Sequence, residues 1–69
     1  MTREQILLEI SFLEFEEEKT KQQMRWHATF PEFVPGGKRA ANDFINEGLD
    51  KLRDIKELQD FWYKKLQEL

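Results

Sequence analysis

The second half of the chain carries small or apolar residues at alternating intervals of four and three, with one polar exception, Gln59. This spacing keeps the side chains on one face of an α-helix, as in the seam of a coiled coil. A β-strand needs a period of two, which fits nowhere over this length. We therefore predict a helix over about 38–68. Its inner seam consists of Ala41, Ile45, Gly48, Leu52, Ile55, Gln59, Trp62, Leu66 and Leu69.

The first half of the chain predicts a second long helix. Thr2 is followed three residues later by Gln5, just before an apolar run, and this is the form of a capping box at a helix start. No Gly or Pro interrupts the residues that follow, so we expect the helix to span about 3–28. Two long helices joined by a short connection predict an all-α fold, an antiparallel helical hairpin that forms one domain over residues 1–69.

The connection, about 29–37, contains both prolines of the chain and two of its three glycines. Thr29 and Glu32 have the spacing of a second capping box, which predicts a short helical turn that contains Pro31. Gly37 is expected to act as the N-cap of the second helix.

The first helix carries two apolar stripes, which lie roughly 160° apart at 100° per residue. One stripe consists of Ile6, Ile10, Leu13 and Met24, and the other of Leu8, Phe12, Phe15 and Trp26. Because a single partner helix covers only one stripe, we expect two hairpins to pair as a four-helix bundle homodimer. The candidate dimer interface consists of Leu8, Phe12, Phe15, Phe44, Leu58 and Phe61. In the alternative, the connection folds back over the second stripe, but it can shield only one end of a helix about 38 Å long.

Charge is segregated along the chain, although the net charge is only -3. Residues 1–18 carry a net charge of -5, residues 19–39 carry +4, and residues 40–69 carry -2. The basic segment includes the tip of the hairpin, where aromatic rings lie between the cations. Aromatic residues and Arg are enriched at binding hot spots, so the tip is the candidate partner-binding surface. Its residues are Arg25, Trp26, His27, Phe30, Phe33, Lys38 and Arg39. The alternative is that these rings only cap the end of the helical core.

Three functions fit this pattern. The favoured interpretation is a non-enzymatic protein-protein interaction or regulatory module that acts as a homodimer and binds another protein. A nucleic-acid accessory protein that uses the basic aromatic tip is the first alternative, but five cations in an acidic chain of pI about 5.1 fall short of a dedicated binder. A structural assembly unit is the second alternative.

Several function classes are disfavoured by composition. The chain has no Cys and one His, which argues against a thiolate nucleophile, a zinc site and a catalytic dyad, so we expect no enzyme, no metal and no cofactor. The "GGKR" segment lacks the first Gly and the Ser or Thr of a phosphate-binding loop. The N-terminal sequence does not resemble a signal peptide, and no apolar run approaches the ~18 residues of a membrane span. We expect a cytoplasmic protein without membrane contact.

Overall fold

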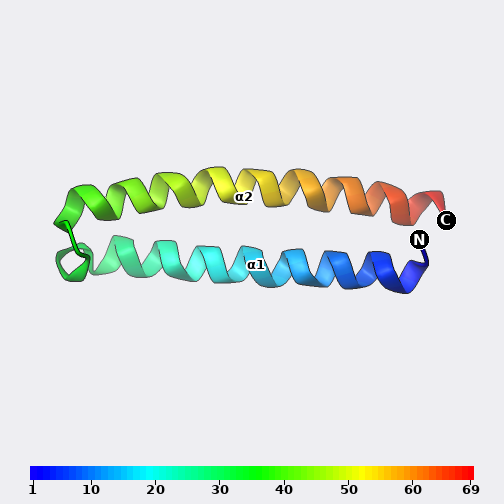
Figure 1. Cartoon of the computed structure of the whole chain (residues 1–69), viewed down its shortest axis with the longest axis horizontal. Coiled ribbons are helices and arrows are strands. Elements are labelled where there is room, and N and C mark those ends of the chain that lie inside the picture. Colours follow the sequence, from blue (N-terminus) through cyan, green and yellow to red (C-terminus); the bar gives the residue numbers. More distant parts are fainter.

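The computed structural model describes all 69 residues and contains two long antiparallel helices (Figure 1). Helix α1 spans Arg3–Thr29, a single 3-10 turn η1 spans Pro31–Phe33, and helix α2 spans Gly37–Glu68. The two helices lie side by side along a molecule of 49 × 15 × 13 Å, and both chain ends lie at the end opposite the connection. The predicted all-α helical hairpin is thereby confirmed. We call the end that holds the connection the tip and the other end the open end.

The start of α1 is the predicted capping box. The backbone N–H of Gln5 donates to Thr2 Oγ1 at 3.3 Å, and the backbone N–H of Thr2 donates to Gln5 Oε1 at 2.9 Å. Two amide groups that the first turn leaves without helical partners are thus satisfied by side chains.

The prediction of a second capping box at Thr29 is wrong, although the short turn that it was meant to open is present. The Thr29 hydroxyl instead donates backwards to the carbonyl of Arg25 at 2.8 Å, because Thr29 is still the last residue of α1. Phe30 precedes the 3-10 turn and makes no side-chain cap. Pro31 opens this turn, which suits a residue that has no N–H to satisfy.

The N-cap of α2 is Gly36, not Gly37 as predicted. Both glycines have positive φ, 94° for Gly36 and 72° for Gly37, and α2 begins at Gly37. A side chain at Gly36 would also lie too close to the methyl group of Ala40, because an ideal Cβ at Gly36 falls 2.8 Å from Cβ of Ala40. The chain therefore reverses direction over two left-handed residues, a conformation that favours glycine at both.

The core lies along the predicted seam of α2. Every seam residue from Ala41 to Leu66 is buried or half-buried, whereas Leu69 lies beyond the end of α2 and is exposed. Residues of the first stripe of α1 face this seam, with Ile6, Ile10 and Leu13 buried.

The polar middle of α1, residues 16–23, is mostly exposed, with one buried exception. Thr20 is buried, and its hydroxyl has no hydrogen-bond partner. Glu16 forms an ion pair across the hairpin with Lys51 at 3.4 Å, and Glu17 forms an ion pair with Lys21, four residues later in the same helix, at 3.6 Å. The polar segment thus contributes one residue to the core and one contact to α2.

Candidate functional site

The tip holds a continuous series of aromatic rings. In order of contact, the series runs Phe33, Phe30, Trp26, His27 and Phe44. Neighbouring ring centroids are 6.1, 6.0, 5.2 and 3.8 Å apart. The first three spacings are those of packed aromatic pairs and the last is a closer, face-to-face stack, so the series forms one unit that spans both helices and the connection.

His27 contacts both α1 and α2 at the tip. Its ring stacks on Phe44 with an interplanar angle of 8°, and its Nδ1 lies 2.7 Å from the carbonyl oxygen of Gln23. Since a carbonyl oxygen can only accept, Nδ1 carries the hydrogen in this contact. The ring is half-buried, and these contacts make His27 a packing residue at the end of α1.

The other rings of the series are accessible. The exposed fraction is 69% for Phe33, 48% for Trp26 and 41% for Phe30. The cations among them, Arg25, Lys38 and Arg39, are exposed too. None of these cations belongs to the ion pairs of the structure, which are Glu17–Lys21, Glu16–Lys51, Asp50–Arg53 and Lys65–Glu68. The positive charge of the tip is therefore not neutralised by contacts within the chain.

A second accessible surface is the outer face of α1, which consists of Leu8, Phe12 and Phe15. Their exposed fractions are 69%, 59% and 64%. No segment of the connection covers them, because η1 lies at the tip (Figure 1). The structure thus places the second predicted stripe of α1 on the surface, on the side of the helix away from α2.

Two exposed side chains of α2 extend this apolar surface. Glu16 and Lys51 form an ion pair on one side of the hairpin, which we call the ion-pair side. Phe12 lies one helical turn before Glu16, and Leu58 lies two turns after Lys51, so both lie on the ion-pair side. Phe61 follows Leu58 by one turn, and each is about half exposed. The predicted interface residue Phe44 differs from the other five because it packs against His27 and is half-buried.

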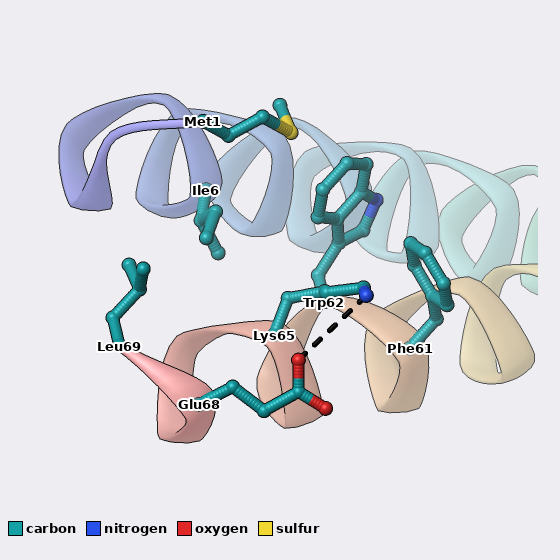
Figure 2. A pocket seen from close by; sticks show the side chains of 7 residues that line it. All are labelled: Met1, Ile6, Phe61, Trp62, Lys65, Glu68 and Leu69. Carbon is teal, nitrogen blue, oxygen red and sulfur yellow. Dashed lines mark ion pairs between the residues drawn. The ribbon is translucent and has the colours of Figure 1, made fainter.

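The open end contains a cavity of about 380 Å³ that sequence reasoning missed (Figure 2). Its lining consists of Met1, Ile6, Phe61, Trp62, Lys65, Glu68 and Leu69. The ammonium of Lys65 forms an ion pair with Glu68 at 3.6 Å and lies 5.5 Å from the ring centroid of Phe61. The indole of Trp62 extends from α2 toward α1. The cavity is mostly apolar, and Lys65 and Glu68 are its charged residues.

No group of three or more His, Cys, Asp or Glu side chains is placed to hold a metal ion. Neither helix combines the length and the apolar composition that crossing a bilayer requires. No family model, curated protein or solved structure matches the chain. The candidate functional surfaces are therefore the tip, the outer face of α1 and the cavity.

Proposed function

We propose that this chain is a non-enzymatic interaction module that works as a homodimer of helical hairpins. The observation that carries the proposal is the exposed outer face of α1, where Leu8, Phe12 and Phe15 have no partner within the chain. Each of these side chains gains about 1.5–3 kcal/mol when it is removed from water. A second copy of the same face would provide that burial for both subunits and would complete a four-helix bundle.

The size and shape of the hairpin also support the proposal that it forms a dimer. A compact monomer of 8.4 kDa exposes about 4600 Å², whereas this hairpin exposes 5468 Å². Its radius of gyration is 15.4 Å, against about 11 Å for a compact domain of this length. The excess surface is close to the ~800 Å² that each partner contributes to a standard interface. The hairpin therefore exposes more surface than a compact monomer of its mass, as expected of a chain that buries part of its surface against a second copy.

Self-association is tested by sedimentation equilibrium at micromolar concentration. We expect the wild type to sediment as a dimer and Phe12→Asp to sediment as a monomer or to unfold, since a charge in a dry interface costs several kcal/mol. Asn46→Asp is the matched control, because Asn46 is exposed on α2, the helix that does not carry this stripe. A constant mass of 8.4 kDa for the wild type at all concentrations would contradict the proposal.

The tip is the surface that we assign to a second protein. Phe33 is the most exposed ring of the series, and Lys38 and Arg39 are exposed and without acidic partners. Phe33→Ser should abolish capture of a partner from the source cell while the helix content stays unchanged by circular dichroism. Leu49→Ser is the matched control, because Leu49 is an exposed apolar residue of α2 that lies outside the tip. Equal capture by both variants and wild type would refute this assignment.

A nucleic-acid accessory function is the second candidate, and the free cations of the tip favour it. Cations bind phosphates, and exposed rings stack on unpaired bases. The discriminating measurement is binding to single-stranded RNA and to an acidic peptide at two salt concentrations. Steep loss of RNA affinity with salt, together with loss in Lys38→Gln, would favour this candidate over protein docking.

A further inference from the structure

We propose that Lys19 selects the orientation of the dimer, because it interrupts a seam on the outer face of α1 along which two copies pair in opposite directions. The orientation rests on the dimerisation proposed above and adds to it the residue that decides between the two arrangements. Two observations carry it, namely the order of residues along this seam and the distribution of charge along α1.

The outer face of α1 continues toward the tip with the spacing of a coiled coil. Six exposed side chains follow one another at alternating intervals of four and three, namely Leu8, Phe12, Phe15, Lys19, Gln22 and Trp26. This spacing keeps all six on one side of the helix, so a second helix can pack along them. We call these six residues the outer seam. Its one charged residue is Lys19, which belongs to none of the ion pairs within the chain.

Lys19 distinguishes the two ways in which outer seams can pair. In a parallel pair each position faces itself, so the ammonium groups of two Lys19 side chains meet inside the interface, where like charges repel. An antiparallel pair with its twofold axis near residue 17 aligns the two seams over their whole length and separates the two lysines. Its layers are Lys19 with Phe15, Gln22 with Phe12 and Trp26 with Leu8, each between copies.

The antiparallel pair gives Lys19 suitable neighbours. The stem of a lysine packs on apolar surface, and its ammonium group is attracted to the face of an aromatic ring, here that of Phe15 in the other copy. Glu18 lies next to the twofold axis, is exposed and forms no ion pair within the chain. Lys19 of one copy therefore lies near the carboxylate of Glu18 in the other copy, so each lysine gains an opposite charge.

Charge along α1 favours the same orientation. Residues 1–18 carry a net charge of -5 and lie toward the open end, and residues 19–39 carry +4 and lie toward the tip. A parallel dimer would place like charge beside like charge along the whole length of the molecule. An antiparallel dimer places the basic segment of each copy beside the acidic segment of the other.

Spin labels measure the orientation. The chain has no Cys, so Arg3→Cys and Ala28→Cys, both at exposed positions of α1 outside the outer seam, can each be labelled alone. In the antiparallel dimer, labels at the same position lie about 40 Å apart along the axis for residue 3 and about 33 Å for residue 28. A mixture of the two variants should add a short distance, because residue 3 of one copy and residue 28 of the other lie only about 5 Å apart along the axis.

A parallel dimer would give the reverse pattern. Labels at the same position would be close together, and the mixture would add a distance of about 38 Å along the axis. This pattern would overturn the proposed orientation while leaving dimerisation intact. The absence of any intermolecular distance would contradict dimerisation itself.

Lys19→Leu tests the residue that selects the orientation. Leucine removes the repulsion that a parallel pair would suffer, so in labelled Lys19→Leu proteins we expect the short same-position distances of the parallel dimer to appear beside the antiparallel ones. Dimerisation should tighten about tenfold, since a polar residue in a seam specifies the arrangement at a cost in stability. Lys56→Leu is the matched control, because Lys56 is exposed on α2 and forms no ion pair, and it should keep the wild-type distances. Antiparallel distances alone in Lys19→Leu would show that Lys19 does not select the orientation.

Discussion

Gly48 offers the sharpest test of how α1 and α2 pack. It is buried at the centre of the α2 seam, and an ideal Cβ there would fall 2.6 Å from both Cγ and Sδ of Met24. Gly48→Ala should gain about 1 kcal/mol from helix propensity. The added methyl group overpacks the contact with Met24, which typically costs about 1–3 kcal/mol. We expect a net loss of stability of about 1 kcal/mol, because the flexible side chain of Met24 can relieve part of the overlap.

The effect of Gly48→Ala on stability should change sign when the side chain of Met24 is shortened. In a Met24→Ala background the overlap is removed, so Gly48→Ala should then stabilise the protein by about 1 kcal/mol. The coupling energy between the two substitutions is thus about 2 kcal/mol, a value typical of residues in contact. Urea denaturation of the four proteins, followed by circular dichroism at one protein concentration, measures this coupling.

A control separates the contact from helix propensity. Asn46 is exposed on the same helix, so Asn46→Ala should have the same effect in both backgrounds. If Gly48→Ala stabilises the wild type and the Met24→Ala variant equally, Met24 does not fill the space beside Gly48 and the described packing of the helices is wrong.

Further predictions concern buried positions of the hairpin. Thr20→Val should raise stability by about 1 kcal/mol, or Tm by about 4–8 °C, because it removes a buried hydroxyl without a partner. Thr29→Val, which removes an exposed hydroxyl bonded to a carbonyl, should give no gain, and an equal gain in both variants would contradict the explanation. Ile55→Ala should lower the free energy of unfolding by about 2–4 kcal/mol in urea denaturation, and Leu52→Ala by less, because Leu52 is only half-buried. A larger loss for Leu52→Ala would place the centre of the core elsewhere.

Two features of the fold could be predicted because they depend on residues close in sequence. The seam of α2 follows from periodicity, since each interval of four or three returns the side chain to the same face of a helix. The start of α1 follows from the pair Thr2 and Gln5, whose contact spans only three residues. Neither prediction needed knowledge of how the helices pack.

Other features depend on how the two helices meet, and polarity alone misleads there. Thr20 lies seven residues after Leu13 and four before Met24, so it continues the inner stripe of α1, yet it is polar, stands among polar residues and was not counted in that stripe. That spacing was the sequence signal that Thr20 would be buried. The open-end cavity had no such signal, because it depends on where the ends of α1 and α2 lie relative to each other. The N-cap at Gly36 was missed by one residue because either of two adjacent glycines fits the turn.

The tip was expected either to cap the core or to bind a partner, and in the structure its aromatic residues differ in burial. Phe44 is half-buried beneath His27 and joins α1 to α2, whereas Phe33 extends the series into solvent with 69% of its surface exposed. Phe44→Ala should therefore lower Tm by several degrees, since it removes a stacked pair and apolar burial at the end of the core. Phe33→Ala should leave Tm nearly unchanged. Thermal unfolding of both variants at one protein concentration measures the difference, and a larger loss for Phe33→Ala would show that the exposed ring, rather than the stacked pair, closes this end of the hairpin.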